Sequence, residues 1–183
     1  MFNKIKFNSA GFSIMELIVV GGIVVIISVM FLVNFRGTEN KFALENEAEK
    51  IASILRQAQM LTLIGQTSGG DRHNYGVHIS TCTSGSCPYY LFGDEKEAGN
   101  KTYDADEEDN GGFGHNILKG VYVSSVAPGA GTDLDVVFEV PLGTIYFNGA
   151  AVGETATITL EHALFDGIKN IIINRSSGQI EIE

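Results

Sequence analysis

The sequence predicts an α+β fold in which a long N-terminal helix packs on an antiparallel β-sheet domain. Three observations lead to this prediction. Residues 11–33 form an apolar run, residues 38–64 carry apolar side chains at helical spacing, and from residue 75 onward short strand-like runs alternate with turn signals. A helix followed by a series of strands is typical of α+β domains.

The apolar run is long enough to cross a membrane. From Phe12 to Val33 it has 22 residues, and Glu16 is the only charged one. Such a helix extends about 33 Å, against a hydrocarbon core of about 30 Å. An ionised side chain in hydrocarbon costs about 2.5–3.5 kcal/mol, so Glu16 requires a partner. Cleavage between Gly11 and Phe12 would supply one, because the new α-ammonium would lie four residues before Glu16.

Two alternatives for this segment are a secretory signal and an uncleaved signal anchor. A secretory signal has its cleavage site after the apolar run, whereas here the small residues 8–11 precede it. A signal anchor explains the length of the run and leaves Glu16 unexplained. With or without cleavage, two lysines before the run and one arginine after it predict a cytoplasmic N-terminus. Residues 37–183 are then expected outside the cytoplasm.

The segment resembles the class III signal of type IV prepilins and type II secretion pseudopilins. A polar leader ends in Gly11, Phe12 follows, and Glu16 is the fifth residue from the start of the apolar run. The resemblance implies that a prepilin peptidase cuts after Gly11 and N-methylates Phe12. It also implies that Glu16 forms an assembly salt bridge. The family usually has a proline where this chain has Val33, so the first helix is expected to run straighter.

The resemblance implies a pilin-like fold in three parts. They are a leader at 1–11, a transmembrane and filament-core helix at 12–36, and an extracytoplasmic globular domain at 37–183. The globular domain comprises an amphipathic helix at 38–64 and a β-sheet at 75–183.

The amphipathic helix is predicted from apolar residues three or four positions apart, namely Leu44, Ala48, Ile51, Leu55 and Ala58. Gly65 is expected to end it. Two alternatives are open for where this helix begins. Thr38 or Asn40 would cap a separate helix, or residues 13–64 would form one continuous helix of about 78 Å.

Eight strands are predicted from the alternation of β-type runs and turn signals. They are 75–80, 89–92, 117–126, 134–140, 144–148, 156–164, 168–174 and 178–183. Within this order, Phe138, Pro141, Gly143 and Gly178 fit loose patterns that resemble H-type minor pseudopilins. Some members of that group bind DNA through basic C-terminal strands. The last strand of this chain is acidic instead, so DNA binding is not carried over.

Composition narrows the function classes. Forty-four percent of the residues are apolar, which argues against disorder. Of the 22 acidic residues, 21 lie from Gly37 onward, against 9 of the 12 basic ones. Nucleic-acid binding draws on Lys and Arg that neutralise phosphates, so nucleic acid is not an expected partner.

Two local features outside the helices are a cysteine pair and an acidic stretch, and the first is interpreted from the expected oxidising location. Cys82 and Cys87 are expected to form a small disulfide loop, with a pair of free thiols as the alternative. Asp104, Asp106 and Glu108 alternate in an acidic stretch, as the first oxygen ligands of a calcium loop do. The glycine and the closing glutamate of that motif are missing, so a solvated charge run is the competing interpretation of this possible Ca²⁺ site.

No enzyme motif appears in the sequence. The four histidines lack metal-ligand spacing, and His78 and His162 are expected to be exposed or hydrogen-bonded on strands. The expected function is a structural subunit of a type IV pilus or type II secretion pseudopilus. The implied partners are prepilin peptidase, other pilin or pseudopilin subunits, the inner-membrane assembly platform and membrane lipid. The implied location is a single-pass membrane protein, then a periplasmic or extracellular filament. The alternative is a minor tip, adhesin or competence-filament pilin that presents a binding surface.

Overall fold

The computed structural model describes residues 11, 13–65, 67–68, 71–72, 74–83, 87–94, 100–104, 113–118, 120–129, 131–139 and 143–183. The chain divides into two compact units, Met1–Glu39 and Asn40–Glu183.

One helix, α1 (Ile14–Ile64), contributes to both units. Its backbone is helical throughout, so Thr38 and Asn40 lie inside α1 and the prediction that one of them caps a separate helix is wrong. The continuous alternative is the one observed. Gly65 ends the helix as predicted: it has φ +64°, and its N–H donates to the carbonyl of Thr62 at 3.0 Å. Only glycine adopts this left-handed backbone without steric cost.

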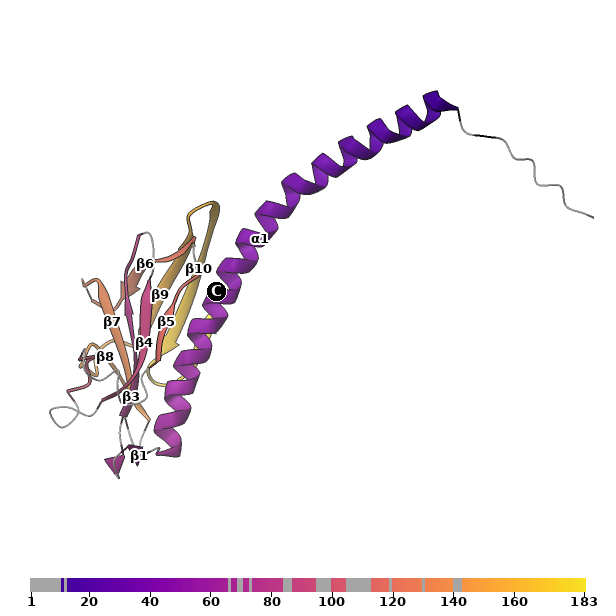
Figure 1. Ribbon diagram of the computed structural model, residues 1–183. Coiled ribbons are helices and arrows are strands. Elements are labelled where there is room, and N and C mark those ends of the chain that lie inside the picture. Colours follow the sequence, from indigo (N-terminus) through magenta and orange to yellow (C-terminus); the bar gives the residue numbers. More distant parts are fainter. Residues whose placement is uncertain are drawn as a thin grey trace, which may run out of the picture. The chain divides into compact units, whose positions relative to one another are not determined.

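The strands after α1 form antiparallel sheets, so the α+β class is confirmed (Figure 1). A five-stranded sheet has the order β5-β4-β3-β7-β8, a four-stranded sheet has the order β11-β10-β9-β6, and β1 pairs with β2 alone. The strands are β1 (Thr67–Ser68), β2 (Asp71–Arg72), β3 (Asn74–Ser80), β4 (Pro88–Asp94), β5 (Phe113–Asn116), β6 (Val121–Ala127), β7 (Asp133–Glu139), β8 (Thr144–Phe147), β9 (Thr155–His162), β10 (Phe165–Asn174) and β11 (Ile180–Ile182).

The strand predicted at 117–126 is partly wrong. The structure has β5 before it and begins β6 only at Val121. Gly120 has φ +103°, which is outside the extended region, and the N–H of Val121 donates to the carbonyl of Leu118 at 3.0 Å. This turn separates β5 from β6, and the two strands belong to different sheets. The short strands β1, β2 and β5 had no clear alternation in the sequence and were not predicted.

The core of the second unit lies between α1 and the inner faces of both sheets. All five apolar residues predicted on one face of α1 are at most 1% exposed, so that prediction is confirmed. They join a single apolar cluster with strand residues such as Val77, Ile79, Ile158 and Ile171. Complete burial of a Val, Leu or Ile side chain stabilises by about 1.5–3 kcal/mol, so this cluster is the main source of stability in this unit.

The disulfide expected between Cys82 and Cys87 is present. It follows the end of β3, a strand of the five-stranded sheet, and lies beside β6, an edge strand of the four-stranded sheet. The N–H of Cys82 donates to the carbonyl of Val123 at 3.0 Å, and the N–H of Val123 approaches Cys82 Sγ at 3.4 Å. The N–H of Ile117 donates to the carbonyl of Cys87 at 3.1 Å. The bridge therefore secures the point where the β3 end meets β6.

Candidate assembly site at the start of the apolar helix

The first turn of α1 is capped by Ser13. Its hydroxyl accepts the N–H of Met15 at 3.3 Å, and its carbonyl accepts the N–H of Leu17 at 3.2 Å. These bonds satisfy donors that a helix start leaves without intrahelical partners. Glu16 stands three residues after the cap, which is the S-x-x-E spacing of a capping box. This cap was not predicted, although Ser13 and Glu16 carry its signal in the sequence.

The capped start changes the electrostatic setting of Glu16. Helix N-termini carry a partial positive charge, and a carboxylate in the first turn gains about 0.3–1 kcal/mol from it. That is less than the cost of about 2.5–3.5 kcal/mol for a charge within hydrocarbon. Glu16 is exposed and makes no hydrogen bond or ion pair with the described part of the chain. In hydrocarbon, the local dipole would therefore offset only part of the cost of the Glu16 charge.

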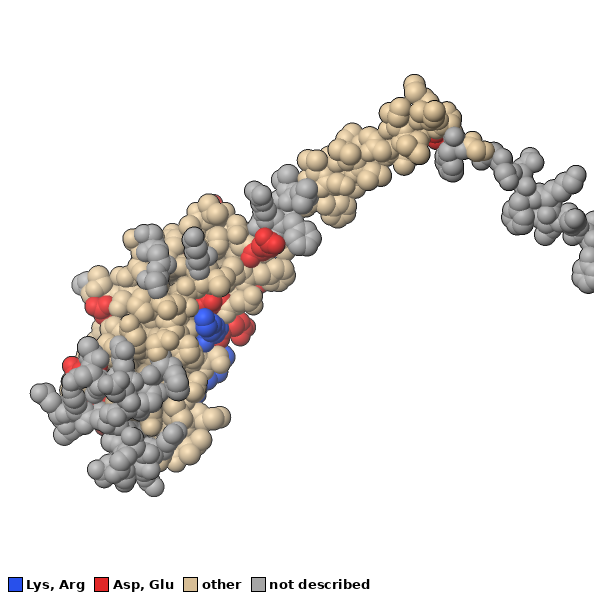
Figure 2. All heavy atoms as spheres, in the orientation of Figure 1, with Lys and Arg blue, Asp and Glu red and all other residues tan. Residues whose placement is uncertain are grey.

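The stretch Ile14–Phe31 is long and apolar enough to cross a membrane, and none of its residues is buried. Its large apolar side chains range from 48% exposed at Ile27 to 81% at Ile14. In Figure 2 this part of the helix is almost entirely free of charged side chains. Ser28 donates its hydroxyl proton to the carbonyl of Val24 at 2.7 Å, so this polar group is satisfied within the helix.

Of the residues predicted at the cleavage site and at the calcium site, only some belong to the described part of the chain. Gly11 is exposed, whereas Phe12 lies outside the described residues. Asp104 accepts a hydrogen bond from Asn100 Nδ2 at 3.1 Å, while Asp106 and Glu108 also lie outside the described residues. Among the described positions, no three His, Cys, Asp or Glu side chains are grouped as metal ligands. Calcium binding by the acidic stretch stays a prediction.

The two histidines expected on strands are both hydrogen-bonded. His162 Nδ1 accepts the N–H of Leu164 at 3.1 Å, and His78 bonds to Asp135 and Ser80. His115 stacks on Tyr89, with ring centroids 5.3 Å apart. Burial lowers the pKa of His115, and the positive charge of Lys50 lowers it further.

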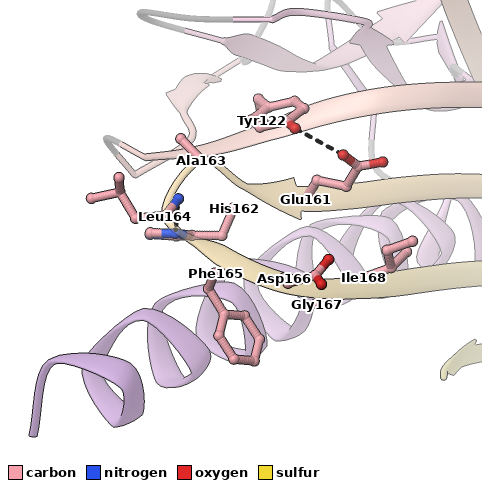
Figure 3. A pocket seen from close by; sticks show the side chains of 9 residues that line it. All are labelled: Tyr122, Glu161, His162, Ala163, Leu164, Phe165, Asp166, Gly167 and Ile168. Atoms are coloured by element: carbon pink, nitrogen blue, oxygen red, sulfur yellow. Dashed lines mark hydrogen bonds between the residues drawn. The ribbon is translucent and has the colours of Figure 1, made fainter. Parts of the chain in front are cut away.

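A hollow at the β9–β10 end of the four-stranded sheet is a second candidate surface (Figure 3). Tyr122 donates its phenolic proton to Glu161 Oε2 at 2.8 Å at one side of it. Leu164 and Ile168, which line it, are 83% and 59% exposed. The pairing of β9 with β10 is irregular between Phe165 and Ile168, which lets the hairpin depart from regular alternation.

A Cβ at Gly167 would clash with the ring of Phe165, which packs against the core, so a larger residue there requires this ring to move. The residues that line the hollow combine apolar side chains with the acidic Glu161 and Asp166, the imidazole of His162 and the phenol of Tyr122.

Comparison with protein families, curated proteins and solved structures finds no match to this chain.

Proposed function

We propose that the chain is a structural subunit of a type IV pilus or type II secretion pseudopilus. In this proposal prepilin peptidase cuts after Gly11, and the subunit assembles through the first part of α1. The observation that carries the proposal is the uncovered apolar stretch Ile14–Phe31, with Glu16 as its only charge, in a chain whose second unit has a complete core of its own. An apolar helix surface of this size requires either lipid or other helices around it.

Before processing, the helix holds the subunit in the membrane. The two leader lysines remain in the cytoplasm, and the β-rich unit lies on the other side. The hydroxyl of Ser28 suits this environment, because its hydrogen bond to Val24 leaves no unsatisfied donor in hydrocarbon. The disulfide between Cys82 and Cys87 is consistent with an oxidising compartment for the second unit.

After processing, the new ammonium of Phe12 provides the charge that Glu16 lacks. Glu16 of an incoming subunit pairs with the Phe12 ammonium of a neighbour as the apolar helices leave the lipid and pack together. In a packed apolar core the pair is weakly screened, and a wrong register leaves a lone charge that costs several kcal/mol. The pair therefore selects the register of assembly as well as contributing affinity.

The hollow at the β9–β10 end supports a second candidate function, a minor tip, adhesin or competence-filament pilin. Leu164 and Ile168 present apolar surface that the described part of the chain does not cover. Abundance distinguishes the two functions. A main structural subunit dominates sheared filaments, whereas a tip subunit is scarce in them and is needed for adhesion or uptake.

The S-x-x-E spacing allows a sharp test of the charge. Glu16→Gln keeps a side chain that can serve in a capping box and removes the charge, and Glu16→Ala removes both. Ser13→Ala removes the observed cap of Met15 N–H and keeps the charge. We expect all three variants to be cleaved after Gly11. We expect both Glu16 variants to be depleted at least about tenfold from filaments, which corresponds to about 1.4 kcal/mol. Ser13→Ala should assemble nearly as the unmodified chain does.

Filament content is measured by immunoblotting of sheared filaments against total protein. Cleavage is measured by intact mass. Normal incorporation of Glu16→Gln together with poor incorporation of Ser13→Ala would show that Glu16 acts as a capping residue, and the proposed pairing with Phe12 would be wrong.

A further inference from the structure

The outer face of the five-stranded sheet brings together His78 and Ser80 of β3 with Asp135 of β7, which lies 57 residues after His78. On β3, Val77 and Ile79 are in the core, so His78 and Ser80 face the other way. In the register of β3 with β7, His78 lies directly opposite Asp135, and Ser80 lies opposite Asp133. Side chains opposite one another on the same face of a sheet are within contact distance.

The distances form a continuous chain of hydrogen bonds. His78 Nδ1 is 2.6 Å from Asp135 Oδ1, and His78 Nε2 is 3.1 Å from Ser80 Oγ. A hydroxyl bonded to an imidazole that is itself oriented by a carboxylate is the arrangement that activates serine nucleophiles. We propose that Ser80 is a nucleophile, that His78 is its general base and that Asp135 is the positioning residue. This inference is independent of the filament role.

Asp135 selects the required tautomer of His78. An ionised carboxylate only accepts hydrogen bonds, so the short contact places a proton on Nδ1. In the neutral imidazole Nε2 then carries a lone pair directed at Ser80. Asp135 is in turn held by the N–H of Tyr103, which donates to its Oδ2 at 3.3 Å. The ring of Tyr103 stacks on His78 with centroids 4.4 Å apart and restricts the rotation of the imidazole.

Asp133 competes for the same hydroxyl proton. A hydrogen bond from Ser80 is the main cause of the lowered pKa of Asp133, with smaller contributions from Thr132 and from the charge of His78. Ser80 has one proton to donate. If it donates to Asp133, then Nε2 must donate to Ser80, which requires the imidazolium form of His78. If His78 is neutral, Ser80 can donate to Nε2 and its oxygen becomes nucleophilic.

Reactivity of Ser80 therefore requires the neutral form of His78. The groups that face His78 are Asp135 and Asp133 on β7, Tyr90 on β4, and Tyr103 in the segment after β4.

The substrate class is small activated acyl or phosphonyl esters, since His78 and Asp135 keep only 14% and 13% of their side-chain surface exposed. With a fluorophosphonate, Ser80 Oγ forms a bond to phosphorus as the P–F bond breaks. Fluoride leaves, and the hydroxyl proton moves to His78 Nε2. With an ester, Oγ bonds to the carbonyl carbon, the alcohol leaves with the proton from Nε2, and an acyl-serine remains for hydrolysis by water.

The test is covalent labelling of the full-length chain in detergent micelles by a fluorophosphonate, with peptide mass spectrometry to locate the label. The exposed serines Ser176 and Ser177 are internal controls, because their bonds are to Asn174 and Gln179 and not to a base. General-base assistance contributes about 100-fold or more, so Ser80 should react about 100-fold faster than either control. Equal rates at the three serines would overturn the proposal.

Two variants separate a positioning role from a structural one. Asp135→Asn should reduce labelling of Ser80 by about 100-fold or more, because an amide no longer dictates the tautomer of His78. Asp133→Ala should keep or increase labelling of Ser80, because it removes the competing acceptor for the hydroxyl proton. Undiminished labelling of Asp135→Asn, or a loss of labelling in Asp133→Ala, would contradict the assignment.

Discussion

The two parts of α1 differ in what surrounds them. In the first unit, Ile14–Phe31 has no buried residue, and a Cβ added at Gly21 or Gly22 would meet no described atom within 4 Å beyond the helix's own backbone. In the second unit, Ile51 and Leu55 are 0% exposed against the sheets. Both parts have the same helical backbone. The helix is thus packed on its own domain in one part, whereas Ile14–Phe31 is not packed against any described residue of the chain.

A second difference concerns an acid in each part of the helix. Glu16 is exposed in the first turn, whereas Glu47 is 4% exposed beneath the sheets. Glu47 Oε1 pairs with Lys50 Nζ at 3.5 Å, and its Oε2 has no hydrogen-bond partner among the described residues. The domain already supplies Glu47 with a cation. Glu16 receives one, in the proposed function, only from the cleaved N-terminus of another subunit.

The largest change in stability is expected when a buried apolar residue of α1 is truncated. Ile51→Ala should lower the free energy of unfolding of the second unit by about 2–5 kcal/mol, because it leaves a cavity where no solvent enters. Ile23→Ala, at a position 52% exposed, removes the same atoms and should leave that stability unchanged. Urea unfolding of both full-length variants in micelles, followed by circular dichroism of the β-rich unit, measures the difference. Similar losses for both variants would mean that the two parts of α1 are not stabilised separately.

A smaller effect is expected when each acid is replaced by leucine. Glu47→Leu should leave the free energy of unfolding unchanged or raise it by about 1 kcal/mol. It removes a buried oxygen that has no hydrogen-bond partner in the described part of the chain. The ion pair that is lost contributes little, because its lysine is exposed. The substitution should also lower the raised pKa of Tyr89, because the charge of Glu47 adds to the main effect of burial.

Ultraviolet titration of tyrosinate and urea unfolding test both statements. Glu16→Leu provides the matched variant: it should leave the second unit equally stable and abolish incorporation into filaments. A strong loss of stability in Glu47→Leu would show that its pair with Lys50 has a larger structural role.

The smallest expected effect is a pH dependence of stability from His115. Its pKa in the folded chain is lowered, first by burial and then by Lys50. The unfolded chain therefore binds this proton at higher pH than the folded chain. The contribution of His115 to stability is complete above its ordinary pKa of about 6.5 and is lost as pH falls toward the lowered folded value. His115→Gln should flatten the stability curve in that interval, as measured by Tm against pH; an unchanged slope would contradict the assignment.

Much of this fold was predictable because its signals are local. The buried face of α1 follows from residues three and four apart, and the end of α1 follows from Gly65. The disulfide follows from two cysteines separated by turn-forming residues. The boundary of β6 was not predictable from its run of apolar residues, because the turn at Gly120 depends on its backbone conformation.

The candidate sites also differ in whether a local sequence signal reveals them. Glu16 was identified from its isolation in an apolar run, and the cap at Ser13 was available from a three-residue spacing. The network at His78 was not available, because Asp135 lies 57 residues away and meets it only through the register of β3 with β7. One residue of slip would move Asp135 to the other face of the sheet. Side-chain networks across strands require the register, which the sequence pattern does not specify.

In the proposed function, proteolysis supplies the cation for Glu16. The intact mass of the chain recovered from assembled filaments tests this, in cells with and without prepilin peptidase. The proposal predicts a chain that begins at Phe12 and carries one added methyl group, and no assembly when the peptidase is absent. Filaments built from chains that retain residues 1–11 would contradict it.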